Sequence, residues 1–262
     1  MTMPVSLHRE ALPSTGSTAA GPGGEVAVIT MDRPEARNAM STDLLVAFVD
    51  ALDEAEADAS LAGIVVTGAN GVFSAGADVR EDMADGGRRR MELFALLYER
   101  LTLCQVPTVA VMVGPAVGGG VEVAAACDLR MAEPSAWIRY PGAIHRVPVG
   151  TARTIGLVGL GTAKDWVLSA RDVRRGELVA AGFVQRAVGA GEGMAAALEW
   201  LGLVASRDAD TVALLKRMFN DSSGLRDRTM FENDALRATA EAGQLPPGLD
   251  VDVPRTIRPR RR

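Results

Sequence analysis

The most informative segment of the sequence reads Pro107-Thr-Val-Ala-Val-Met-Val-Gly-Pro-Ala-Val-Gly-Gly-Gly-Val-Glu-Val-Ala-Ala-Ala-Cys-Asp128. It opens with an apolar run, 108–113, of the kind found in strands that are buried on both faces of a parallel sheet. Three glycines, 118–120, then lead into an apolar stretch that predicts a helix over 121–127. A buried strand, a glycine-bearing turn and a helix in direct succession indicate an α/β sheet.

The same alternation of strands and helices continues on both sides of this segment. Apolar runs at 25–31, 63–67 and 128–131 predict further strands. Ser41 is placed to cap a helix with apolar residues at helical spacing, and 88–103 predicts a second helix. Beyond residue 151 the pattern is helical, in the segments 162–169, 174–181, 193–206, 208–219 and 224–242. Short connections between strands and helices predict a parallel α/β sheet.

The composition is that of a globular protein. The chain has 262 residues, of which 48% are apolar and 23% charged, so it can form one large α/β core and is too apolar for wholesale disorder. A net charge of −5 provides no general attraction to nucleic acid. No signal-peptide pattern occurs, and no apolar stretch reaches the roughly 18 residues of a membrane-spanning helix. We expect a cytoplasmic protein with neither a nucleic-acid nor a membrane partner.

Cysteine and histidine are too sparse for a disulfide scaffold or a usual zinc site. The two cysteines, Cys104 and Cys127, lack CxxC spacing, and the two histidines are His8 and His145. Reduced thiols are the ordinary state of such cysteines in a cytosolic protein. We therefore expect no bound metal.

The glycines at 118–120 and the acidic residue that follows them are the first candidates for chemistry. Backbone N–H groups at a helix start favour developing negative charge, and glycine lets a ligand approach closely. The glycines thus predict an oxyanion site or, alternatively, only tight packing of helix on sheet. Glu122, among valines and alanines, is either a first-turn residue favoured by the helix dipole or a carboxyl group in a dry pocket, suited to proton transfer.

A second glycine-bearing loop, Gly71-Val-Phe-Ser-Ala-Gly-Ala-Asp78, also follows a buried strand. Its glycines do not have the GxGxxG spacing of dinucleotide-binding proteins, and the chain has no GxxxxGK[ST] phosphate loop. Ser74 lies outside any GxSxG motif, and no histidine is placed for a catalytic triad. Nucleotide binding and serine-hydrolase chemistry are therefore not indicated.

Three segments, in this order, resemble the signatures of the crotonase superfamily, also called the enoyl-CoA hydratase/isomerase family. They are Met31-Asp-Arg-Pro-Glu-Ala-Arg-Asn-Ala-Met40, Gly71-Val-Phe-Ser-Ala-Gly-Ala-Asp-Val-Arg-Glu81 and 107–128. The resemblance implies an α/β crotonase spiral of repeated ββα units with a helical C-terminal trimerisation region, and hence a homotrimer or hexamer. It divides the chain into an N-terminal strand and flexible loop (1–24), a crotonase core (25–206), a C-terminal helical region (207–242) and a Pro- and Arg-rich tail (243–262).

The resemblance also implies an acyl-CoA thioester substrate, as in fatty acid metabolism. Coenzyme A then arrives as part of the substrate, and no separate cofactor is expected. The matching oxyanion-hole donors are the backbone N–H groups of Ala77 and Gly119, and Glu122 matches the first of two catalytic glutamates. One oxyanion donor is worth roughly 10²–10³ in rate. The positions matched to CoA or substrate binding are Ala36, Arg37, Ala39, Ala75, Gly76, Ala77, Asp78, Val79 and Gly119.

The second catalytic glutamate of the family's hydratases follows a proline, and here that dipeptide is Pro141-Gly142. We therefore expect hydration of crotonyl-CoA to be weak or absent, and expect Gly142→Glu to raise it. His145 is the candidate replacement. The first hypothesis is an enolate-stabilising enzyme of the enoyl-CoA hydratase/isomerase type, an isomerase or lyase, with Glu122 as its single carboxylate. The alternatives are a decarboxylase or other lyase of the superfamily and a catalytically silent acyl-CoA-binding protein.

Overall fold

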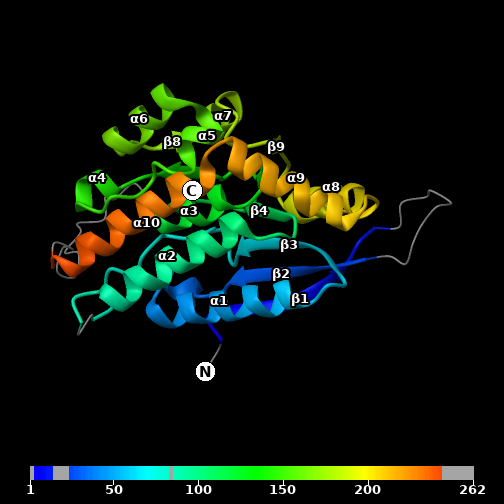
Figure 1. The fold of residues 1–262 in the computed structure, drawn as a ribbon, viewed down its shortest axis with the longest axis horizontal. Coiled ribbons are helices and arrows are strands. Elements are labelled where there is room, and N and C mark those ends of the chain that lie inside the picture. The colour runs from blue at the N-terminus through cyan, green and yellow to red at the C-terminus, as the bar shows by residue number, and fades with distance from the viewer. Residues whose placement is uncertain (1–2, 14–23, 83–84, 244–262) are drawn as a thin grey trace, which may run out of the picture.

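Strands and helices alternate in the first half of the chain, and helices dominate the second half (Figure 1). The computed structural model describes residues 3–13, 24–82 and 85–243. The strands are β1 (Val5–Ala11), β2 (Glu25–Met31), β3 (Leu61–Gly68), β4 (Thr108–Met112), β5 (Ala116–Val117), β6 (Leu129–Ala132), β7 (Trp137–Arg139), β8 (Val173–Arg174) and β9 (Arg186–Ala187). The helices are α1 (Thr42–Ala57), α2 (Arg88–Leu103), α3 (Gly119–Ala126), α4 (Gly142–His145), α5 (Thr154–Val158), α6 (Leu160–Ser169), α7 (Arg175–Ala180), α8 (Gly193–Ala205), α9 (Ala209–Ser222) and α10 (Leu225–Glu241), with a short 3-10 helix at Pro34–Ala36.

The main sheet has the strand order β1-β2-β3-β4-β6-β9. β1 runs antiparallel to β2, and the later neighbours pair in parallel. Successive side chains of a strand point to opposite faces, so buried strands supply two apolar clusters. Toward α8 lie Val26, Val28, Val65, Val109 and Met131. Toward α1, α2 and α3 lie Ala27, Ile29, Ile64, Val66 and Ala110.

A small second sheet, β5-β7-β8, positions the start of α3. β5 pairs in parallel with β7, and the Gly118 N–H donates to the Arg139 carbonyl at 2.9 Å. α3 begins one residue later, and its residues from Gly120 to Ala126 are all buried. The first turn of α3 is thus held between the two sheets, in the middle of the molecule (Figure 1).

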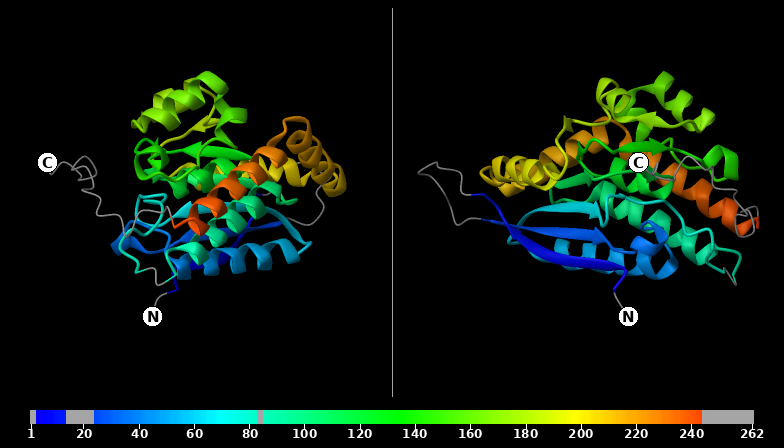
Figure 2. Two further views of the ribbon diagram at one scale, coloured as in Figure 1. Left: turned by 60° about the vertical axis from the view of Figure 1, so that its left-hand side comes forward. Right: turned by 180° about the vertical axis from the view of Figure 1, so that it is seen from behind.

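The C-terminal helix α10 lies beside α2 (Figures 1 and 2). The buried Asn233 of α10 donates through Nδ2 to the Ala95 carbonyl of α2 at 3.0 Å. α9, in contrast, exposes apolar side chains, including Met218 and Phe219. The trimer that the sequence predicts for this region stays a prediction. Within the described ranges, no helix combines the length and apolar character needed to cross a membrane.

Most of the predicted long elements are confirmed. The helix predicted at 88–103 has the predicted ends, and the Ser41 Oγ caps α1 by accepting from the Leu44 N–H at 3.3 Å. The strand predicted within residues 1–24 covers residues 5–11, which pair along the whole of β2. Most of the predicted N-terminal loop (14–23) and nearly all of the tail (244–262) lie outside the described residues.

Candidate active site

The two segments matched to CoA binding lie side by side and are joined by backbone hydrogen bonds. The Ala75 N–H donates to the Arg37 carbonyl at 3.0 Å. The Met40 N–H donates to the Gly76 carbonyl at 2.7 Å, and the Asp78 N–H donates to the Met40 carbonyl at 3.0 Å. Segments that are far apart in the sequence therefore form one continuous rim.

Buried polar side chains hold this rim in place. The Asn38 amide donates through Nδ2 to the carbonyl groups of Ala69 and Val72 at 3.0 and 2.8 Å. The Ser74 hydroxyl donates to the Asn38 carbonyl at 2.7 Å. Asn38 also adopts a positive φ of 56°, a conformation that asparagine tolerates better than most residues. Ser74 is therefore a structural hydroxyl that fixes the loop.

Asp78, a predicted binding residue, directs its carboxylate into the protein. Its Oδ2 accepts from Arg33 Nη1 at 3.0 Å, and its Oδ1 accepts from the Arg80 N–H at 3.1 Å. Its backbone carbonyl accepts from Arg90 Nη1 at 2.6 Å. These hydrogen bonds make Asp78 a structural residue of the loop that carries Ala77. Its carboxylate is bound to Arg33 and Arg80 and is not directed at a ligand.

The loop after β3 touches the start of α3 at Gly76. Gly76 has a φ of +86°, and a Cβ on it would lie 2.5 Å from the Val117 carbonyl oxygen and 3.4 Å from the Gly119 nitrogen. Only glycine fits such a position, because an added carbon would collide with backbone. The contact brings the two predicted oxyanion-hole loops together.

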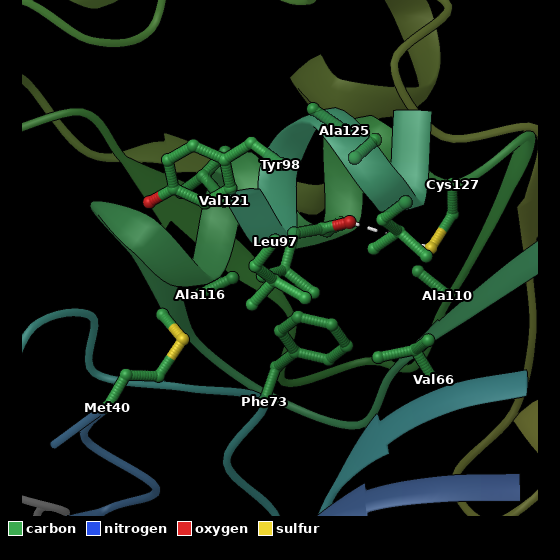
Figure 3. Close-up of a cluster of buried hydrophobic side chains, with 14 of the residues drawn as sticks. Met40, Val66, Phe73, Leu97, Tyr98, Ala110, Ala116, Val121, Ala125 and Cys127 are labelled. Atoms are coloured by element: carbon green, nitrogen blue, oxygen red, sulfur yellow. Dashed lines mark hydrogen bonds between the residues drawn. The ribbon is translucent and has the colours of Figure 1, made fainter. Parts of the chain in front are cut away.

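The backbone N–H groups of Ala77 and Gly119 are the two predicted oxyanion-hole donors. In the described part of the chain neither group donates a hydrogen bond to another protein atom. The side chains beside Gly119 are Met40, Phe94 and Tyr98, whose ends would lie 2.7 to 2.9 Å from a Cβ at this position. Figure 3 shows Met40 and Tyr98 at the same end of the buried apolar cluster. Two N–H groups beside Met40, Phe94 and the Tyr98 hydroxyl suit a thioester oxygen that gains negative charge.

The remaining positions matched to CoA differ in exposure. Ala36 and Ala39 are buried, whereas Ala75 and Val79 are half-buried. Arg37 is exposed, and its guanidinium makes no ion pair with any described residue. It is therefore available to an anionic group such as a phosphate.

Glu122 is fully buried on the first turn of α3. Its Oε2 accepts from Arg153 Nε at 2.7 Å, while its Oε1 has no hydrogen-bond partner among the described residues. Burial raises the pKa of Glu122 to about 7, although the nearby Arg153 lowers it in part and Glu232 adds to the rise. The dry-pocket hypothesis thus describes Glu122 better than the exposed first-turn alternative. Such a carboxyl group can take up or release a proton near neutral pH.

The space around Gly142 bears on the expected effect of Gly142→Glu, which stays a prediction. A Cβ at Gly142 would lie 2.6 Å from the Val147 carbonyl oxygen and 3.2 Å from Val149 Cγ2. Because backbone cannot move aside cheaply, Gly142→Glu would disturb the segment around α4 rather than just add an acid. The backbone around Gly142 therefore leaves little space for any side chain at this position.

His145 ends the short helix α4 and is half-buried. Burial lowers its pKa from the ordinary value, so the imidazole is neutral near pH 7. Its side chain forms no ion pair with a described residue, and it stays a candidate only.

The sequence did not single out three residues around Glu122: Tyr98, Arg153 and Glu232. The Arg153 guanidinium lies 5.0 Å from the centre of the Tyr98 ring and contacts both carboxylates. Glu232 comes from α10, 110 positions after Glu122 in the numbering. No local spacing signals such a contact. The only available signal was the presence of acidic residues at apolar helix positions.

The comparisons with known proteins support the resemblance that the sequence shows. A family model described as "Enoyl-CoA hydratase/isomerase" matches residues 22–242. The chain belongs to the enoyl-CoA hydratase/isomerase family. The fold class expected from the three signatures is therefore confirmed, and solved members of the crotonase superfamily share it.

Individual members of the enoyl-CoA hydratase/isomerase family carry different names. The short-chain-enoyl-CoA hydratase of Clostridium acetobutylicum is 33% identical over 204 residues, covering 75% of this chain and 78% of the relative. The crystal structure of an enoyl-CoA hydratase/isomerase from Xanthobacter autotrophicus Py2 has a TM-score of 0.77 and 28% identity, covering 85% and 86% of the two chains. A monofunctional enoyl-CoA isomerase from M. smegmatis has a TM-score of 0.67 and 25% identity, covering 87% and 99%.

Proposed function

We propose that the protein is an acyl-CoA thioester-binding enzyme that stabilises a thioester enolate. The N–H groups of Ala77 and Gly119 form the oxyanion hole, and Glu122 is the single carboxylate that moves the proton. The observation that carries the proposal is the Glu122 carboxyl group itself: it is fully buried, one oxygen is unpartnered among the described residues, and its pKa is raised to about 7. It stands on the helix that Gly119 begins.

The reaction that fits one carboxylate is proton transfer within a bound thioester. Ionised Glu122 takes a proton from the carbon next to the thioester carbonyl, and the electron pair moves onto the carbonyl oxygen. The two N–H groups stabilise the resulting negative charge. The protonated Glu122 then returns the proton to a carbon of the same substrate, so that a double bond shifts and no atom is gained or lost. Isomerisation and related lyase outcomes therefore fit better than hydration, which also requires activated water.

Substrate binding uses the rim formed by the two joined segments. Arg37 is the exposed cation available to CoA phosphates, and the small side chains of Ala36, Ala39 and Ala75 leave room for the pantetheine arm. We propose that the working form is a homotrimer or hexamer of this chain with no cofactor besides the substrate.

A second candidate function is binding of acyl-CoA without catalysis. One observation favours it: the backbone around Gly142 leaves no space for the second carboxylate. In this case the two N–H groups still hold a thioester, but no turnover follows.

A panel of thioesters distinguishes the two functions. The full-length protein is incubated with 2-enoyl, 3-enoyl and malonyl-type CoA thioesters, and products are followed by mass spectrometry. We expect turnover of at least one thioester and weak or absent hydration of crotonyl-CoA. Saturable binding of several thioesters without any product would favour the silent protein, and no binding at all would overturn both functions.

Glu122→Gln tests the residue that carries the proposal. The amide keeps the shape but cannot take up a proton, so we expect a loss of roughly 10²–10⁴ in rate with acyl-CoA binding retained. Glu92→Gln is the matched control, because Glu92 is exposed on α2 and pairs with Arg237 at 2.7 Å. Unchanged turnover in Glu122→Gln would show that the proton is moved by another group.

A further inference from the structure

The interior between α2, α3 and α10 holds three charged side chains in direct contact. Arg153 lies between two carboxylates: its Nε donates to Glu122 Oε2 at 2.7 Å, its Nη2 forms an ion pair with the same oxygen at 2.5 Å, and its Nη2 donates to Glu232 Oε1. The three side chains are at most 2% exposed. Since a buried charge is stable only when it is paired, this group must balance itself without water.

The two carboxylates differ in how well the protein stabilises their charge. Glu232 Oε2 accepts from the Thr151 N–H at 2.6 Å, the Thr151 hydroxyl at 2.9 Å and the Ala152 N–H at 3.0 Å, in addition to the contact with Arg153. Glu122 is hydrogen-bonded to Arg153 alone among the described residues, and its Oε1 is unpartnered. Hydrogen bonds stabilise a buried carboxylate, and Glu232 accepts more of them than Glu122 does.

The charge balance then assigns the buried proton. One guanidinium neutralises one carboxylate, so the group is neutral only when the other carboxyl group is protonated. The hydrogen-bond pattern leaves Glu122 as the partner that is protonated below its pKa of about 7 and ionised above it. Tyr98 on α2 and Tyr140 before α4 are the other titratable groups near Glu122, and burial raises the pKa of both phenols, so they stay neutral.

We propose that Glu232 is a positioning residue for Glu122: acting through Arg153, it orients the Glu122 carboxyl group and directs the shared proton to it. Arg153 contacts both carboxylates, so Oε2 of Glu122 is fixed, while Oε1 has no hydrogen-bond partner among the described residues. The use of that proton in catalysis rests on the proposed function. The pairing itself requires no substrate, and it makes α10 part of the active centre.

The experiment reads the protonation of Glu122 directly. Infrared spectra of the full-length protein are recorded across pH, and the protonated-carboxyl band of Glu122 is identified by its loss in Glu122→Gln. In Glu232→Gln the amide oxygen can still accept from Thr151 and Ala152, but the negative charge is gone. Arg153 then neutralises Glu122 alone, and we expect the titration midpoint of Glu122 to fall by about one pH unit or more.

A second variant moves the midpoint in the opposite direction. Arg153→Met with Glu232→Gln removes both neighbouring charges and leaves Glu122 buried without a cation, so its midpoint should rise by about one pH unit or more. This double variant still tests whether the Glu122 midpoint responds to the two neighbouring charges, even if Glu232→Gln alone does not fold. Glu92→Gln is the control, because it removes a carboxylate of an exposed α2–α10 ion pair that does not contact Arg153.

The outcomes separate this proposal from the proposed function. Opposite shifts in the two variants and none in the control support the role of Glu232, and the pH profile of any turnover should shift with them. A Glu122 midpoint unchanged in whichever of these variants folds would overturn it and reduce Glu232 to a structural contact of α10. Shifted midpoints in a protein that converts no thioester would sustain the pairing and refute the proposed function.

Discussion

At the residue scale, the carboxyl group of Glu122 is tied at one oxygen and unpartnered at the other. Arg153 fixes Oε2, and burial disfavours the ionised form enough to bring the pKa to about 7. An ordinary exposed glutamate is fully ionised there and is a weak base. The environment of Glu122 therefore supplies both the orientation and the basicity that the proposed proton transfer requires.

The raised pKa of Glu122 predicts the pH dependence of turnover. A base works in its ionised form, so the rate should increase as pH rises through about 7 and should fall about tenfold per pH unit well below it. Initial rates with the best thioester of the panel, measured across pH at subsaturating substrate, test this. A rate that stays constant down to the usual glutamate pKa of 4.5 would contradict the assignment of Glu122 as the base.

Residue-scale contacts were the least predictable from the sequence. The three signatures placed Ala77, Gly119 and Glu122 near one another, since each follows a buried strand of one sheet. Arg153 and Glu232 were missed, because they are 79 positions apart and no periodicity links them. The assignment of Gly142 to the place of the family's second glutamate stays a prediction, and the tight contact of Gly142 with the Val147 backbone depends on the path of a loop that no spacing encodes.

At the element scale, the site depends on how closely the loop after β3 approaches the start of α3. Gly76 and Gly71 both lie in this loop with positive φ, but of the two only Gly76 has another backbone segment in the direction of an added Cβ. A Cβ on Gly71 has nothing within 4 Å, whereas one on Gly76 meets the Val117 carbonyl at 2.5 Å. Comparing a substitution at Gly71 with the same substitution at Gly76 therefore separates the cost of backbone strain from the cost of steric contact.

Gly76→Ala and Gly71→Ala therefore form a matched pair. Both should lose roughly 1–2 kcal/mol of unfolding free energy from the left-handed conformation. Gly76→Ala should lose about 1–3 kcal/mol more, because the added methyl group pushes against backbone, and should also weaken acyl-CoA binding. Urea unfolding and calorimetric titration with an acyl-CoA measure the two effects. Equal losses in both variants would show that the contact with Val117 yields without cost.

Long elements could be predicted, whereas short ones could not. α2 and β2 have the predicted ends because sixteen and seven residues, respectively, are enough to display a period. β5, β8 and β9 have two residues each, and α4 has four, so their sequences carry no pattern. They form because neighbouring elements pair with them, as Ala116 does with Ile138.

At the scale of the whole molecule, α9 presents apolar side chains that no described residue covers. Met218 is 54% exposed and Phe219 is 71% exposed. Exposed apolar side chains on one helix are typical of an interface. The trimer or hexamer that the family resemblance implies would cover them, and it stays a prediction.

Light scattering should therefore report a trimer or hexamer for the full-length protein. Phe219→Glu places a charge in the proposed interface and should shift the mass toward smaller species. Ser222→Glu, at the exposed end of the same helix, is the control and should keep the mass of the natural protein. A monomer at micromolar concentration in the natural protein would remove the trimer from the proposed function.

The contact between Arg153 and Glu232 also has a consequence for the newborn chain. Arg153 is translated 79 residues before Glu232, so during synthesis its guanidinium is present before this second carboxylate. Until α10 docks against α2, Arg153 has Glu122 as its carboxylate partner and lacks the contact from Glu232. Any product that stops short of α10, through a premature stop codon or proteolysis, keeps all three segments that resemble the family signatures and still lacks the proposed positioning residue of Glu122.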